Sequence, residues 1–201
     1  MLYVSSAPEP VFADRVRLPL RFDVARMRAE VEALTADAWV RHYVPANFEG
    51  EWDVLPLRSP AGATHPIQQI YSDPCATEYV DGPLLSRAPY IREVIASFAC
   101  PLRAVRLMRL TPGSRIKEHS DHDLGAEYGK ARIHVPVTTN PDVVFEVNRR
   151  PVEMAPGETW YLRLSDPHRV ANDGTSDRVH LVIDAILDDW LEAQLRAGSE
   201  S

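Results

Sequence analysis

The fold is decided by residues 104–185, which contain the runs AVRLMRL (104–110), RIKEHSD (115–121), ARIHVPVT (131–138), VVFEVN (143–148), PVEM (151–154), ETWYLRL (158–164), HRVAN (168–172) and DRVHLVIDAIL (177–187). Turn residues with Gly, Pro or Asp separate the runs, as in TPGS, NPD, APG and DGTS. About eight short strands at this spacing, with no helical pattern between them, are typical of an antiparallel sandwich or barrel. We therefore expect a mainly β protein of the jelly-roll kind.

Helices are predicted on both sides of this β-rich stretch. Residues 23–36 place apolar side chains at helical spacing behind Asp23, which is a good N-cap. A second helix is predicted to begin near Ser86 or Ala88 and to stop before the Cys100-Pro101 pair. The stretch DDWLEAQLRAG, residues 188–198, has the pattern of a short helix that ends at Gly198.

The segment from Trp39 to Pro83 is rich in Pro, Gly, Asp and aromatic residues, and only EWDVLPLR (51–58) within it is typical of a strand. Long irregular segments often cover active sites. A chain of 201 residues fits a single domain. We expect one domain over residues 1–201, with a helical or irregular part that shapes a substrate pocket (1–100), a jelly-roll core (104–185) and a C-terminal helix (186–198).

Composition narrows the range of partners. A net charge of −7 disfavours a nucleic-acid surface, which needs clustered Lys and Arg. No apolar run approaches the length of a membrane span, and the first residues lack a secretory pattern, so we expect a cytoplasmic protein without a membrane partner. Cys75 and Cys100 lack CxxC spacing and are expected to stay reduced. Small molecules or peptides are the expected partners, and the oligomeric state is left open.

An H-x-D pair and a later histidine form the candidate metal site. His119 and Asp121 share one face if their strand is regular, and His168 begins a later strand. Two imidazoles and one carboxylate can hold Fe(II) while leaving positions open for a cosubstrate and O2. The tripeptide also arises by chance, and an isolated histidine is often a structural residue. From these residues alone, both interpretations stay open.

Two Arg-x-His pairs suggest an anion site near these ligands. Arg132 and His134 point to one side of their strand, and Arg178 and His180 repeat the arrangement on another. Arginine presents a planar, permanently charged fork that suits a carboxylate. The alternative is a solvent-exposed sheet face, for which charged residues are equally suitable.

With these motifs the sequence resembles the aspartyl/asparaginyl β-hydroxylase family of Fe(II)- and 2-oxoglutarate-dependent dioxygenases. The resemblance rests on RLMRLTPGSRIKEHSDHDLG, RIHVPVTTNPDVVFEVN, MAPGETWYL and PHRVANDGTSDRVHLVIDA. It implies a double-stranded β-helix, iron ligation by His119, Asp121 and His168, and binding of the distal 2-oxoglutarate carboxylate by Arg178. It also implies that Arg132 and His134 lie against the cosubstrate.

The resemblance leaves the substrate open. Family members act on Asp or Asn residues in polypeptides, and relatives hydroxylate free amino acids. We therefore expect hydroxylation of a C–H bond in an amino acid, in an Asp- or Asn-type residue of a peptide, or in a related metabolite. Trp52, Arg58 and His65 lie in the irregular segment and are candidates for substrate contact, although each also suits a surface or packing role. His122 follows a predicted ligand and is expected beside the site or at its rim.

Two other classes of protein are compatible with the same β-rich pattern. A cupin-type metal-binding protein or isomerase would hold a metal without oxygen chemistry. A non-catalytic interaction or sensor domain would keep the fold and lose turnover. Both are disfavoured by the intact ligand set and by an arginine ten positions after His168.

Overall fold

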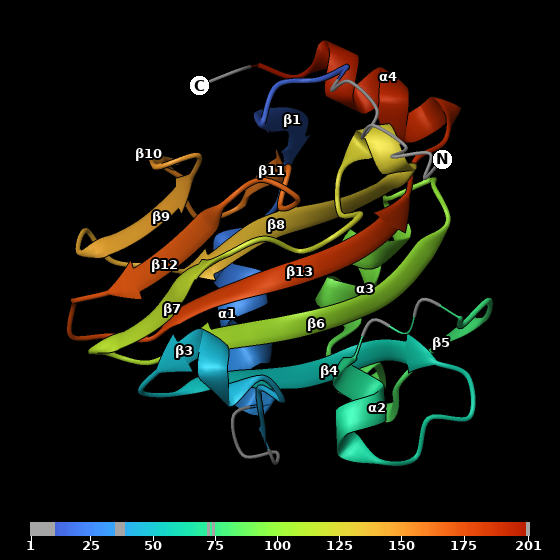
Figure 1. Ribbon diagram of the computed structural model, residues 1–201. Helices are drawn as coiled ribbons and strands as arrows, with labels where there is room; N and C mark the ends of the chain where they lie inside the picture. The colour runs from blue at the N-terminus through green and yellow to red at the C-terminus, as the bar shows by residue number, and fades with distance from the viewer. Residues whose placement is uncertain (1–10, 35–38, 72, 74, 200–201) are drawn as a thin grey trace, which may run out of the picture.

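Two facing β-sheets with helices packed outside them make up the protein (Figure 1). The computed structural model describes residues 11–34, 39–71, 73 and 75–199. Its strands are β1 (Arg15–Arg21), β2 (Val40–Arg41), β3 (Phe48–Glu49), β4 (Trp52–Pro60), β5 (Tyr79–Asp81), β6 (Leu102–Leu110), β7 (Ser114–His119), β8 (Lys130–Thr138), β9 (Val143–Val147), β10 (Arg150–Pro151), β11 (Glu158–Leu162), β12 (His168–Asn172) and β13 (Arg178–Ile186). Its α-helices are α1 (Val24–Leu34), α2 (Pro66–Ile70), α3 (Pro89–Ala96) and α4 (Asp189–Ala197), and its short 3-10 turns are η1 (Pro45–Asn47), η2 (Pro83–Arg87) and η3 (Ala126–Tyr128).

The larger sheet has the strand order β1-β11-β8-β13-β6-β4-β2, with β5 paired to β4. The smaller sheet has the order β10-β9-β12-β7-β3, and every strand pair is antiparallel. Strands that are neighbours in space are far apart in sequence, such as β12 beside β7 and β13 beside β6. The expected mainly β jelly roll with flanking helices is confirmed.

The outer face of the larger sheet is the main apolar core. Ile133 of β8 and Leu181 of β13 point outward there and are fully buried beneath the helices. Met27 of α1, Ile91 of α3 and Leu191 of α4 belong to the same cluster. These helices therefore supply the apolar cover that lets the opposite side of the same strands carry polar groups.

A second apolar cluster lies between the two sheets. It joins Met108 and Val182 of the larger sheet to Ile116, Phe145 and Val170 of the smaller one. Because successive strand residues point to opposite faces, each of these residues alternates with one that faces the other side. This inner cluster ends where the polar site begins.

The helix predictions agree with the structure where it describes them. The Asp23 carboxylate accepts hydrogen bonds from the Ala25 and Arg26 amides, so Asp23 caps α1 as expected. Positions 35 and 36 of the predicted helix lie outside the described residues. Ala88 precedes α3, and α4 runs from its Asp188 cap to Gly198.

The description of residues 1–100 as helical or irregular is wrong for several segments. β1 pairs with β11 at one edge of the larger sheet, and β4 lies beside β6, where it extends two residues beyond the predicted strand end at Arg58. The segment 40–49 adds β2 to an edge of the larger sheet and β3 to an edge of the smaller one. β2 and β3 have only two residues each, which is too short to show strand alternation in the sequence.

Several predicted strands in the core are shorter than expected, including β11, which ends at Leu162. β7 ends at His119, so Asp121 lies beyond the strand, and the predicted strand over 151–154 shrinks to the two residues of β10. Both cysteines have free thiols, and burial raises the pKa of Cys100 to about 11. Among the described helices, none combines the length and apolar character that crossing a membrane requires.

Candidate functional site

His119 and His168 lie opposite each other on neighbouring strands of the smaller sheet. The register of β7 and β12 pairs these two residues directly, and their ring centroids are 4.3 Å apart. The Nδ1 atom of His119 lies 2.7 Å from the Lys117 carbonyl oxygen, and that of His168 lies 3.0 Å from the Asp166 carbonyl oxygen. Because a carbonyl can only accept, each Nδ1 donates, and each Nε2 keeps a lone pair for a metal.

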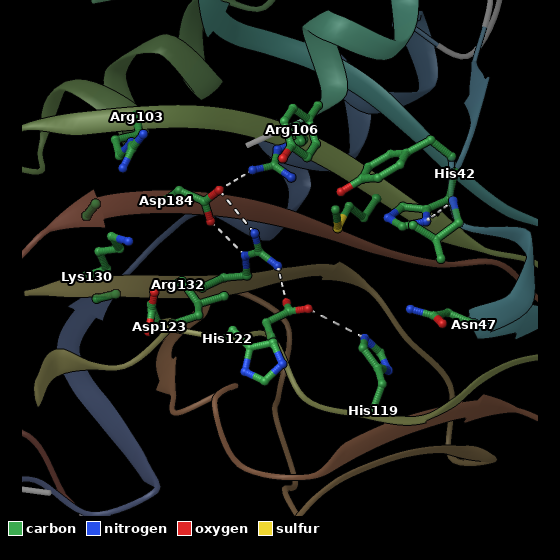
Figure 2. Close-up of a pocket in the computed structure, with 18 of the residues that line it drawn as sticks. His42, Asn47, Arg103, Arg106, His119, His122, Asp123, Lys130, Arg132 and Asp184 are labelled. Carbon is green, nitrogen blue, oxygen red and sulfur yellow. Dashed lines mark hydrogen bonds and ion pairs between the residues drawn. The ribbon is translucent and has the colours of Figure 1, made fainter. Parts of the chain in front are cut away.

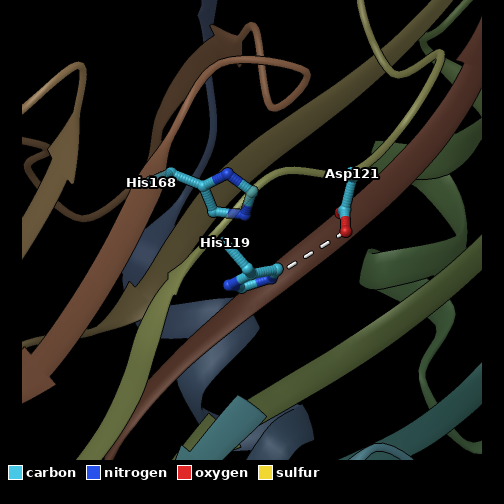
Figure 3. Close-up of side chains that lie close together, drawn as sticks. All are labelled: His119, Asp121 and His168. Atoms are coloured by element: carbon cyan, nitrogen blue, oxygen red, sulfur yellow. Dashed lines mark ion pairs between the residues drawn. The ribbon is translucent and has the colours of Figure 1, made fainter.

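Asp121 completes the group from just beyond the end of β7. Its backbone N–H donates to the Leu164 carbonyl at 2.8 Å, which fixes the chain after the strand. Its Oδ1 atom lies 3.8 Å from Nε2 of His119. Figure 3 marks this ion pair with a dashed line. The candidate ligand atoms of His119, Asp121 and His168 lie within 4.8 Å of one another, and no other such group is found in the described part of the chain. The turn, rather than regular strand alternation, therefore brings the carboxylate to the two imidazoles.

The charge state of His168 suits a metal ligand. Burial lowers the pKa of His168 to about 4, partly offset by its hydrogen bond to the Asp166 carbonyl. The imidazole is therefore neutral at physiological pH, which is the form that binds a divalent cation. Two imidazoles and one carboxylate are a donor set that fits Fe(II).

Arg178 is a buried cation beside this group. It is 2% exposed, and it lines the same narrow cavity as His119, Asp121 and His168. Its Nη2 donates to Nδ1 of His180 at 2.8 Å, and its guanidinium lies 5.5 Å from the centre of the Phe145 ring.

Among the described residues no carboxylate pairs with Arg178, whose pKa is shifted by burial alone, and its Nε has no hydrogen-bond partner. Burial alone lowers the pKa of Arg178 to about 9. His134 and His180 are also buried, at 4% and 2% exposure, so these positions do not form a solvent-exposed face. A buried cation without a counter-charge is costly, and a ligand carboxylate would supply one.

A chain of ion pairs connects Asp121 to the opposite wall of the site. Nη1 of Arg132 donates to Oδ2 of Asp121 at 2.9 Å, and Nε of Arg132 donates to Oδ1 of Asp184 at 2.7 Å. Asp184 also accepts from Nη2 of Arg106. We call these four residues the ion-pair chain (Asp121, Arg132, Asp184 and Arg106). Figure 2 labels three of them, Arg106, Asp184 and Arg132, with the interactions between them dashed.

A wider cavity of about 440 Å³ opens in front of the candidate metal ligands. His42 and Trp52 stack in parallel on its wall, with ring centroids 3.6 Å apart and planes 8° apart. Burial, followed by the nearby Arg106 and Arg132, lowers the pKa of His42 to about 3. One side of this cavity is therefore a neutral aromatic surface, while the other carries Arg106, Arg132 and Asp184.

The sequence of residues 21–187 matches the family model described as Aspartyl/Asparaginyl beta-hydroxylase. This chain belongs to the aspartyl/asparaginyl β-hydroxylase family. A curated relative, the L-proline cis-4-hydroxylase of Rhizobium meliloti (strain 1021), is 27% identical over 169 residues. That alignment covers 82% of this chain and 58% of the relative, so the chain matches less than two thirds of that protein.

Two solved structures share the fold of this family member. One is an oxidoreductase of the 2OG-Fe(II) oxygenase family from Burkholderia pseudomallei, with a TM-score of 0.51, 17% identity and coverage of 86% of this chain and 85% of that one. The other is the non-heme alpha ketoglutarate dependent epimerase SnoN from nogalamycin biosynthesis, with a TM-score of 0.54, 13% identity and coverage of 86% and 76%. At these identities, the likeness concerns the fold.

The candidate substrate residues in this β-hydroxylase family member fall in different places. Trp52 and His122 line the wider cavity, His122 as an exposed residue at its rim. Arg58 instead forms an ion pair with Asp81, and it is not among the residues that line either cavity. His65 caps α2 by accepting a hydrogen bond from the Ile67 amide.

Several lining residues were missed by sequence reasoning. Asp184 shares the strand face of Arg178 and His180, and Arg106 lies in the quoted RLMRL motif, so strand alternation could have identified both. His42, Tyr43 and Asn47 also line the cavity. These three come from the short segment between β2 and β3, where no periodic pattern marks them.

Proposed function

We propose that this protein is an Fe(II)- and 2-oxoglutarate-dependent hydroxylase that acts on a C–H bond of an amino acid, of an Asp- or Asn-type residue in a peptide, or of a related small metabolite. The single observation that carries the proposal is Arg178, a buried cation without a carboxylate partner in the described residues, on the wall of the cavity that holds the candidate metal ligands. A metal site alone requires no such cation, whereas a dicarboxylate cosubstrate needs a cation to bind the carboxylate that does not contact the metal.

The three ligands and the arginine would divide the work between them. Nε2 of His119, Nε2 of His168 and Oδ1 of Asp121 would hold the metal, because their other polar atoms already make hydrogen bonds within the chain. When bound, Fe(II) with 2-oxoglutarate and O2 supplies the oxidising chemistry that replaces a substrate hydrogen by hydroxyl and yields succinate and CO2. The protein holds and orients the reactants rather than transferring protons.

Arg178 would bind the carboxylate of 2-oxoglutarate that lies away from the metal. Two contacts hold its guanidinium group in place: a hydrogen bond to His180 and packing over the Phe145 ring. His134 and Arg132 line the same narrow cavity and would lie beside the cosubstrate. The Nε2 atom of His134 has no hydrogen-bond partner among the described residues, so it is free to contact a ligand.

The wider cavity would receive the substrate. It offers the Trp52 and His42 rings on one side and charged groups on the other, which suits an amino-acid-like molecule or a peptide segment. The curated relative named for L-proline hydroxylation supports a substrate of this class, and the family name supports Asp- or Asn-type residues.

Anaerobic absorption spectroscopy tests the proposal without a known substrate. Fe(II) and 2-oxoglutarate added to the protein should give a weak visible charge-transfer band, and Asp121→Ala and Arg178→Met should each abolish it at the same concentrations. Arg169→Met is the matched control, because Arg169 lies on β12 next to His168 but is exposed and paired with Glu146. A wild-type protein without the band would contradict the proposal. Stoichiometric succinate release across free amino acids and Asp- or Asn-containing peptides would then identify the substrate.

A further inference from the structure

Asp121 contacts an arginine, Arg132, that is not one of the candidate metal ligands. Asp121 has two carboxylate oxygens with different surroundings. Oδ2 accepts a hydrogen bond from Arg132, whereas Oδ1 faces Nε2 of His119. An arginine that occupies one oxygen leaves the other for a metal ion, and the rigid planar fork of arginine also limits rotation of the carboxylate.

Arg132 is itself held in place by a second carboxylate. Asp184 accepts from Nε of Arg132 at 2.7 Å and from Nη2 at 3.1 Å, which is a two-point contact. Asp184 is 5% exposed, and its side chain lies on β13 directly opposite Arg132 of β8 in the strand register. A buried two-point ion pair between residues on paired strands keeps the guanidinium in one orientation.

Arg106 holds Asp184 from the other side. It is 3% exposed, it lies on β6, and it donates to the Asp184 oxygen that also receives Nη2 of Arg132. Three adjacent strands of the larger sheet, β8, β13 and β6, therefore carry the three outer members of the ion-pair chain. The chain links a rigid sheet to Asp121, which lies in a turn beyond β7.

We propose that Arg132 and Asp184 are positioning residues that orient Asp121 for metal binding, with Arg106 fixing Asp184 at the border of the substrate cavity. This inference rests on the proposed function for the identity of the metal ligands. Arg132 would thus orient Asp121 in addition to lying beside the cosubstrate. The larger sheet would then orient the Asp121 carboxylate, which lies beyond the end of its own strand, β7.

Co(II) titration of the metal-free protein tests this proposal independently of turnover, because Co(II) absorption reports both affinity and ligand geometry. Arg132→Lys and Asp184→Asn should each weaken Co(II) binding by about 10- to 100-fold, the usual effect of removing a group that orients a ligand. Both should also change the shape of the absorption bands. A merely structural role would lower stability without changing that spectrum.

A matched control and a double variant sharpen the test. Asp53→Asn removes an Arg–Asp pair on the same sheet, between Asp53 of β4 and Arg109 of β6, and should leave Co(II) affinity and spectrum unchanged. If Asp184 acts through Arg132, the Arg132→Lys/Asp184→Asn protein should bind Co(II) only slightly worse than Arg132→Lys alone.

Three results would overturn the proposal. They are wild-type affinity and spectrum in both single variants, full additivity in the double variant, and equal weakening by Asp53→Asn. Should Asp184→Asn fail to fold, Arg132→Lys, which keeps the charge and loses the fork, still decides the question. Failure of the proposed function would give a different result. Co(II) binding that depends on Asp121, together with no charge-transfer band from Fe(II) and 2-oxoglutarate, would contradict the hydroxylase function and would leave the positioning role supported.

Discussion

His119 and His168 occupy paired positions on two antiparallel strands, and the register is irregular immediately after His168. The spacing of two ligands is therefore set by backbone hydrogen bonds rather than by loops. A site built on paired strands is held more tightly than one built on loops. The extra residue lies on β7, between Ile116 and His119, and irregularities of this kind are often found next to active sites.

Removing the carboxylate ligand should abolish metal-dependent turnover. Asp121→Ala leaves two imidazoles and exposes the Arg132 guanidinium to the metal position, which adds a repulsive charge. We expect succinate formation from 2-oxoglutarate to fall by more than about 100-fold, because loss of a ligand exceeds the loss of a group that only orients one. Full activity in this variant would remove Asp121 from the ligand set.

Replacing the buried arginine should weaken cosubstrate binding and stabilise the ligand-free protein. Arg178→Met deletes a charge-assisted contact worth about 1.5 to 3 kcal/mol, so the Kd for 2-oxoglutarate should rise by about 10- to 100-fold. The same change removes a buried cation that lacks a counter-charge in the described residues, so the melting temperature without ligand should increase. Calorimetric titration and thermal unfolding measure the two effects. An unchanged Kd would contradict the anchoring role.

Stability should fall as the pH drops below about 6.5. Burial, followed by the neighbouring Arg178, lowers the pKa of both His134 and His180 well below 6.5 in the folded protein. The unfolded chain therefore binds more protons below that pH, and each histidine contributes a loss of about 1.4 kcal/mol per pH unit.

Urea unfolding between about pH 7.5 and about pH 5 measures this dependence. His180→Gln should reduce the slope by about 1.4 kcal/mol per pH unit, since one of the four histidines with a lowered pKa (His42, His134, His168 and His180) is gone. A slope that this substitution leaves unchanged would show that other groups control the acid sensitivity.

Substitution on the outer side of β13 should affect stability and spare the metal site. Leu181 is fully buried under the helices, whereas its neighbours His180 and Val182 face the space between the sheets. Leu181→Ala should cost about 2 to 5 kcal/mol in unfolding free energy. Co(II) affinity of the folded fraction should stay at the wild-type value, and a large decrease would show that the two sides of the strand are coupled.

Much of the core could be predicted from sequence, because strands of nine residues show their alternation clearly. The alternation is clear in β8 and β13. Their Arg-x-His pairs lie on the buried inner face, which agrees with the anion-site interpretation and not with a solvent-exposed sheet face. The choice between a buried and an exposed face depended on α1 and α3, which cover the other side. Sequence periodicity alone does not reveal that cover.

The parts that could not be predicted depend on contacts between distant segments. Asp121 reaches the histidines through a turn held by Leu164, and Arg58 is drawn away from the cavity by Asp81. The stack of His42 on Trp52 joins the residue that follows the two-residue strand β2 to the first residue of β4, and the pairing of β2 has no local signal. The position of each of these side chains depends on a contact with a residue from another segment, and the sequence does not show which segments come together.

The segment 40–49 lies at one edge of both sheets, through β2 in the larger and β3 in the smaller. Between these two strands it carries His42, Tyr43 and Asn47 to the wider cavity, while the candidate metal ligands and Arg178 come from other segments. Insertions or deletions here would change the wall of the cavity that we propose receives the substrate, without altering the candidate metal ligands. Related enzymes could therefore diverge in what they accept while retaining one reaction, which makes this edge the natural place to introduce diversity when seeking a new specificity.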